Sequence, residues 1–119
     1  MFVNLTNHPF RDWTLKQQEA AKEYGEVTDY PFPLVPPEFD KKQVNALAER
    51  VINDILQLSP DIVCCQGEMT LTYSLVNLLK EHGIKVVAAC SERNIIEKKA
   101  EGGRIIKTTE FNFVKFREY

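Results

Sequence analysis

Polar residues able to bind or transform a ligand lie in four short segments, each of which follows a run of apolar residues. The segments are Asn7-His8, the proline-rich stretch after Phe32, Gln66 to Thr70, and Ser91 to Asn94. Open parallel sheets bind ligands beyond the carboxyl ends of their strands. If the apolar runs are parallel strands, the sequence predicts one pocket that contains Asn7, His8, Gln66, Gly67, Thr70, Ser91 and Arg93.

Arg93 and His8 carry the most versatile side chains of this set. An arginine can donate two parallel hydrogen bonds to a phosphate, but Arg93 can equally pair with Glu92 or Glu68. A histidine can act as general acid or base near neutral pH, and the proline after His8 favours an extended backbone there. Because a lone histidine is more often structural, both interpretations of His8 stay open.

Gly67 stands directly before a predicted helix. A glycine lets a ligand approach the backbone closely, and the free N–H groups of a first helical turn favour an anion. Glu68 is itself an anion at that position. The alternative interpretation is that Glu68 only complements the helix dipole and that Thr70 or Thr72 caps the helix.

The sequence has no motif for a nucleoside triphosphate, a dinucleotide or a metal ion. It contains no P-loop, G-x-G-x-x-G or HExxH pattern and no CxxC spacing. Its cysteines, Cys64, Cys65 and Cys90, are odd in number and lie in apolar runs, as expected of buried thiols in a reducing cytosol. We therefore expect no cofactor and no metal.

Short apolar runs alternate with helical patterns along most of the chain. The runs predict parallel strands at 1–6, 26–32, 61–66 and 84–90. Between them, Thr14, Asp40 and Gly67 precede segments with helical spacing, the strongest of which runs from Val44 to Ile55. The fold class predicted is α/β, with a Rossmann-like open and mainly parallel sheet flanked by helices.

The last thirty residues change character. Residues 94–99 and 104–109 flank Ala100-Glu-Gly-Gly, which predicts a hairpin turn, and Phe111 to Phe116 predict one more strand. We interpret this tail as an antiparallel extension of the sheet. Residues 94–98 are also compatible with a short helix.

Length and composition indicate one globular domain, residues 1–119. The chain is 44% hydrophobic and 27% charged, and its net charge of −2 argues against duplex nucleic acid as a partner. No apolar run is long enough to span a bilayer, and the first six residues do not have the pattern of a signal peptide. We expect a cytoplasmic protein with no membrane partner.

The chain resembles small CRISPR-associated Rossmann-like proteins found beside type III systems. Three segments of the second half carry most of this resemblance, and the opening Asn4-Leu-Thr-Asn-His also fits. These segments are Gln66-Gly-Glu-Met-Thr-Leu-Thr-Tyr, Ala88-Ala-Cys-Ser-Glu-Arg and Phe113-Val-Lys-Phe-Arg-Glu-Tyr. The middle of the chain matches poorly, and Asn112-Phe113 stands where relatives tend to carry a basic Arg-His pair.

The resemblance implies a dimeric CARF-related domain that recognises cyclic oligoadenylate, and some members of this wider group are ring nucleases. The positions carried over are Asn7, His8, Gln66, Thr70, Tyr73, Ser91 and Arg93. His8 and Ser91 are then the catalytic candidates, and the others bind the ligand. A homodimer is expected because a two-fold interface presents each residue twice around a ring-shaped ligand; the proline-rich loop and the helix after Gly67 are its expected walls.

Three functions stay open at this point. The first is metal-independent cleavage of cyclic oligoadenylate, in which a ribose 2′-hydroxyl attacks the neighbouring phosphate and the protein positions and stabilises charge. The second is a sensor or sponge that binds the same ligand without cleaving it. The third is a structural or interaction subunit without a small ligand.

Overall fold

Five strands form one sheet in the order β2-β1-β3-β4-β5. The structure, a computed structural model, describes residues 1–119. Its strands are β1 (Phe2–Thr6), β2 (Val27–Asp29), β3 (Ile62–Gln66), β4 (Lys85–Lys99) and β5 (Ile105–Glu118), and its α-helices are α1 (Leu15–Lys22), α2 (Lys41–Gln57) and α3 (Met69–Glu81). Strands β1 to β4 are parallel and β5 is antiparallel to β4. The predicted α/β fold is confirmed.

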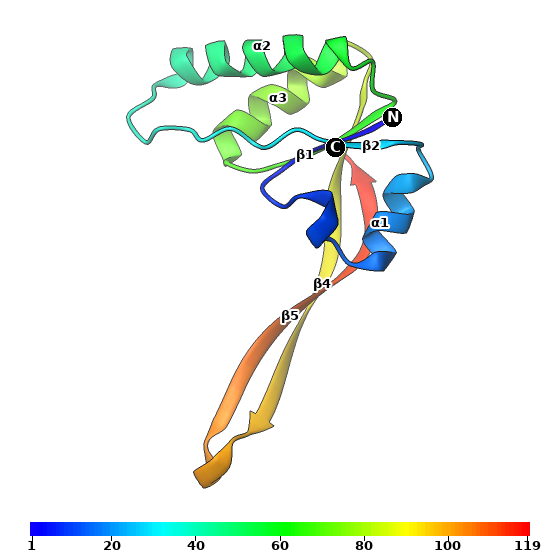
Figure 1. Cartoon of the computed structure of the whole chain (residues 1–119). Coiled ribbons are helices and arrows are strands. Elements are labelled where there is room, and N and C mark those ends of the chain that lie inside the picture. The colour runs from blue at the N-terminus through cyan, green and yellow to red at the C-terminus, as the bar shows by residue number, and fades with distance from the viewer.

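Helices cover both faces of the sheet, with α2 and α3 on one face and α1 on the other (Figure 1). Successive residues of a strand point to opposite faces. In β1, Val3 and Leu5 join the core under α2 and α3, whereas Phe2 packs with Trp13 and Ala21 on the α1 side. All five side chains are buried, so the first strand is the centre of both cores.

Helix α2 begins at a capping box. The Asp40 carboxylate accepts a hydrogen bond from the Gln43 backbone N–H at 2.9 Å, and the Gln43 side chain accepts one from the Asp40 backbone N–H at 2.9 Å. The stripe predicted between Val44 and Ile55 is confirmed, because its apolar residues are buried with the exception of the half-buried Leu47.

The second strand continues beyond its regular part. The backbone N–H groups of Tyr30 and Phe32 donate to the carbonyl oxygens of Asn4 and Thr6, at 2.8 and 3.3 Å. The chain therefore stays beside β1 up to Phe32, as predicted for 26–32. Because prolines cannot donate to a ladder, the four prolines from Pro31 to Pro37 fit this irregular edge.

Strands β4 and β5 extend far beyond the sheet as a two-stranded ribbon (Figure 1). We call residues 91–112 the arm; the glycine turn at its tip has Gly102 and Gly103 at φ +84° and +78°, as predicted for a hairpin. The prediction that β4 ends at residue 90 and that Ser91-Glu-Arg-Asn forms an exit loop is wrong. These residues lie within a 15-residue strand, and the alternative helix at 94–98 does not form.

The arm begins where β4 separates from β3. Regular pairing of these strands ends at Cys64 and Val87. Beyond that point the Gln66 side chain replaces the backbone ladder, because its Oε1 accepts from the Ala89 N–H at 2.8 Å and its Nε2 donates to the Ala89 carbonyl at 3.4 Å. The Tyr119 hydroxyl donates to the Cys65 carbonyl at 2.6 Å. Backbone groups freed by the separation are therefore satisfied by side chains.

We predict that Gln66→Ala loosens the base of the arm. The Ala89 N–H would lose its acceptor, at a cost of about 1–2 kcal/mol, and hydrogen exchange at Ala89 should become faster. Gln66→Glu is the matched control, because it retains an acceptor oxygen. Unchanged exchange at Ala89 in Gln66→Ala would show that the side chain does not hold the two strands.

Candidate functional site

The ends of β1, β3 and β4 form one row at the carboxyl edge of the sheet. Thr6 is in register with Gln66, and the Gln66 side chain is bonded to the backbone of Ala89. Neighbouring strands lie about 4.8 Å apart, so about 10 Å separates the end of β1 from β4. The structure thus brings Asn7 and His8, which follow Thr6, near Ser91, which follows Ala89.

A buried asparagine fixes the loop after β1. The Asn4 side chain is 1% exposed and donates to the His8 carbonyl at 2.8 Å and to Asp29 Oδ1 at 2.9 Å. The Trp13 indole N–H donates to the same His8 carbonyl at 3.1 Å. These bonds hold the backbone of His8, while the side chains of Asn7 and His8 are exposed and form no hydrogen bond within the chain.

Sequence reasoning missed this network. Its signal was a polar residue, Asn4, in the middle of the apolar run Phe-Val-Asn-Leu. A buried amide needs partners, and Asn4 finds them in Asp29 and in the loop that carries His8.

Ser91 and Arg93 lie on the same side of the sheet as α1. Residues 87, 89, 91 and 93 alternate along β4, and Val87 belongs to the core on the α1 side. Arg93 is exposed and forms no ion pair, so neither Glu92 nor Glu68 engages it. Its cross-strand neighbour is Phe111, which is 66% exposed. A free guanidinium therefore stands beside a free aromatic ring.

We call Asn7, His8, Ser91, Arg93 and Phe111 the edge site. Its members share exposure and freedom from hydrogen bonds or ion pairs that would occupy their side chains. A cation can bind phosphate, an aromatic ring can stack on a base, and an imidazole can transfer a proton.

The close approach predicted at Gly67 is made by the chain itself. A Cβ atom at Gly67 would lie 2.5 Å from ring carbons of Phe32. The glycine thus lets the Phe32 ring pack under the start of α3, within the core that also contains Leu71. Gln66 is likewise engaged, because its amide joins β3 to β4.

The start of α3 carries its own anion. The Glu68 carboxylate accepts from the backbone N–H groups of Leu71 at 2.8 Å and Thr70 at 3.0 Å, and also from the Thr70 hydroxyl. The bond from Leu71, followed by those from Thr70, lowers the pKa of Glu68. Glu68 is therefore the N-cap instead of Thr70, and Thr72 accepts from the Gly67 N–H at 3.1 Å.

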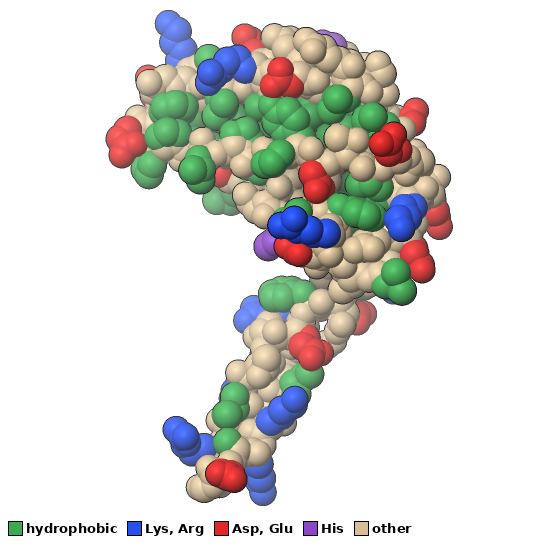
Figure 2. All heavy atoms as spheres, in the orientation of Figure 1, with side chains coloured by type: hydrophobic (Ala, Val, Ile, Leu, Met, Phe, Trp, Pro, Cys, Tyr) green, Lys and Arg blue, Asp and Glu red, His purple; other side chains and the backbone are tan.

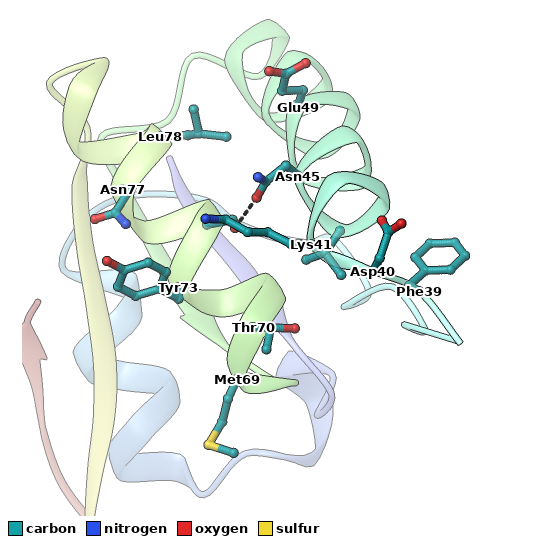
Figure 3. Close-up of a pocket in the computed structure, with 12 residues that line it drawn as sticks. Phe39, Asp40, Lys41, Asn45, Glu49, Met69, Thr70, Tyr73, Asn77 and Leu78 are labelled. Carbon is teal, nitrogen blue, oxygen red and sulfur yellow. Dashed lines mark hydrogen bonds between the residues drawn. The ribbon is translucent and has the colours of Figure 1, made fainter. Parts of the chain in front are cut away.

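Thr70 and Tyr73 line a separate groove between α2 and α3 (Figure 3). The groove has a volume of about 760 Å³, and Ser74 donates to Asn45 across it at 2.9 Å. Tyr73 is 73% exposed and Lys41 extends from α2 towards α3. The predicted pocket is thus divided: Asn7, His8, Ser91 and Arg93 lie at the edge site, and Thr70 and Tyr73 lie in the groove.

The cysteines are not nucleophiles in this fold. Burial raises the pKa of the Cys64 and Cys65 thiols to about 12, so neither forms a thiolate at neutral pH. No cluster of three or more metal-ligating side chains occurs in the structure. None of its helices combines the length and the apolar character needed to cross a bilayer.

One protein family matches nearly the whole chain. The model of the Uncharacterized protein MJ1673 family matches residues 1–117. No curated protein and no solved structure matches the chain. The family match runs through both the sheet and the arm, so the arm belongs to the domain that the family shares.

We predict that the cap at Glu68 gives α3 a stability that depends on pH. A pKa lowered by folding means that the carboxylate stabilises the fold above its unfolded pKa of about 4.3 and that this contribution is lost as the pH falls through the folded pKa. At pH 7 the wild type should exceed Glu68→Gln by about 0.5–1 kcal/mol, because the cap is exposed. The difference should shrink on acidification below about pH 5.

Denaturant unfolding at a series of pH values measures this difference. Glu81→Gln, the same change at the last residue of α3, is the control and should not destabilise the protein, because an anion is unfavourable at a helix C-terminus. A difference between the wild type and Glu68→Gln that stays constant with pH would contradict the assignment.

Proposed function

We propose that this chain, which belongs to the Uncharacterized protein MJ1673 family, binds cyclic oligoadenylate at the edge site and cleaves it without a metal ion. The observation that carries the proposal is the pairing of the free Arg93 guanidinium with the exposed Phe111 ring, next to the loop of Asn7 and His8. A phosphodiester ligand with bases needs both a cation and a stacking surface.

Binding would use the side chains that the protein leaves unengaged. Arg93 would pair with a phosphate, and Phe111, directly opposite it in the ribbon, would stack on a neighbouring base. The Asn7 amide offers both donors and an acceptor to a base or a ribose. Ser91 lies two residues before Arg93 on the same strand face and would orient the ribose or phosphate.

Cleavage would be an internal transfer within the ligand. The ribose 2′-oxygen bonds to the adjacent phosphorus as the bond to the 5′-oxygen breaks, which leaves a 2′,3′-cyclic phosphate and a 5′-hydroxyl. One proton leaves the 2′-oxygen and one reaches the 5′-oxygen, and His8 would carry out one of these transfers. The Arg93 charge would stabilise the crowded phosphate.

Binding without turnover is the second candidate. The His8 imidazole has no hydrogen-bond partner within the chain, so nothing orients it as the base of a catalytic pair is normally oriented. A sensor or sponge would use Arg93, Phe111 and Asn7 in the same way and leave the ligand intact.

We predict different effects for the two key residues. Arg93→Ala should weaken binding of cyclic tetra- or hexa-adenylate by about 1–3 kcal/mol, roughly 5- to 150-fold. His8→Ala should bind nearly as well as the wild type but cleave about 10²- to 10⁴-fold more slowly. Equilibrium binding and single-turnover product analysis on labelled ligand measure the two quantities.

His82→Ala is the control, because His82 caps the far end of α3 and lies outside the edge site. Wild-type binding without product would support the sensor. The edge site is not the functional site if both Arg93→Ala and His8→Ala bind and cleave like the wild type, and neither ligand-based function survives if the wild type binds no cyclic oligoadenylate.

A further inference from the structure

The arm is a ribbon of two strands with no third layer against it. Its side chains from Ser91 to Asn112 are exposed, with only Ile96 and Ala100 half-buried. It projects away from the sheet and helices, and the molecule reaches 55 Å in its longest dimension (Figure 1). An isolated two-stranded ribbon is marginally stable in water, so a partner that covers one face would stabilise the arm.

One face of the arm is apolar. Residues paired across an antiparallel ribbon share a face, as do alternate residues along each strand. The register therefore puts Ile95, Ile105 and Phe111 on one face, where they are 62%, 60% and 66% exposed. Glu97 and Lys107 lie on this face too and form an ion pair of 3.7 Å. Figure 2 shows hydrophobic side chains spread along the arm between charged ones.

The charges of the arm are sorted along its length. Near the sheet stand two acids, Glu92 and Glu110, and one base, Arg93. Towards the tip stand three bases, Lys98, Lys99 and Arg104, and one acid, Glu101. The base of the arm is thus net negative and the tip is net positive, and none of these seven residues is in an ion pair within the chain.

We propose that the apolar face of the arm binds the same face of a second copy, with the two arms antiparallel. A two-fold axis through the Ile95–Thr109 pair would place Ile95 against the partner's Ile95 and Arg93 opposite the partner's Glu97. The positive tip of each arm would lie along the negative base of the other. Parallel arms would put like charges together, so the charge sorting selects the antiparallel arrangement.

The size of the contact sets its strength. The nine residues from Ser91 to Lys99 span about 30 Å at about 3.4 Å per residue. One face of so narrow a ribbon offers less than the roughly 800 Å² per partner of a standard stable interface. We therefore expect a micromolar dimer that weakens as salt screens its charges.

The first experiment compares two exposed isoleucines on opposite faces. Ile95→Lys places two lysines against each other on the axis and should leave a monomer, whereas Ile106→Lys, on the other face, should dimerise like the wild type. Sedimentation equilibrium without ligand, from low micromolar to several hundred micromolar protein, measures both. A monomeric wild type, a dimeric Ile95→Lys, or loss of the dimer in Ile106→Lys would each overturn the proposal.

A charge exchange tests the register. Arg93→Glu and Glu97→Arg each put like charges opposite one another and should weaken the dimer at least several-fold, and the double variant should recover it. Circular dichroism before the measurement identifies any variant that does not fold, and the isoleucine pair then decides. If each single variant dimerises like the wild type, or the folded double variant does not recover the dimer, the antiparallel register is wrong. Neither experiment depends on cyclic oligoadenylate, so its outcome is independent of the proposed function.

Discussion

The separation of β4 from β3 is the constraint on which the arm and the edge site both depend. A strand that leaves a parallel sheet exposes backbone groups that its neighbour had satisfied, and an unpaired buried group is costly. Here the Gln66 amide serves Ala89, and the Tyr119 hydroxyl serves the Cys65 carbonyl. Burial of that hydroxyl raises the pKa of Tyr119 to about 12, so it remains a donor at neutral pH. With both contacts in place, β4 can continue with β5 as its only partner.

The same separation decides what kind of site the carboxyl edge offers. In an ordinary parallel sheet, residues after a strand sit on a loop, but Ser91 and Arg93 sit on a strand whose cross-strand partners, Phe113 and Phe111, are fixed by register. The Phe113 ring lies 4.9 Å from that of Phe116, which packs with Phe2 in the core on the α1 side. The edge site is therefore anchored to the core through a continuous series of aromatic rings.

The sequence predicted the features that burial specifies. The four parallel strands and the α2 stripe were recognisable because apolar side chains recur at the period of each element. The length of β4 was not recognisable, because both faces of the arm are exposed and the polar run Ser91-Glu-Arg-Asn has no alternation that indicates a strand. Gly67 indicated a close approach, but its partner, Phe32, is 35 residues away in the sequence. No local pattern identifies such a contact.

Ligand binding at the edge site and pairing of the arms would act on the same charge. In the antiparallel dimer the rows opposite Ser91 and Arg93 contain the partner's Lys99, the partner's Lys107 and the partner's Glu97. These sum to a net charge of +1, and the carboxylate among them already has a lysine partner within its own arm. The second copy would thus add positive potential where a phosphate binds. Because linkage is reciprocal, a phosphodiester ligand that gains from this potential must strengthen the pairing of the arms by the same free energy.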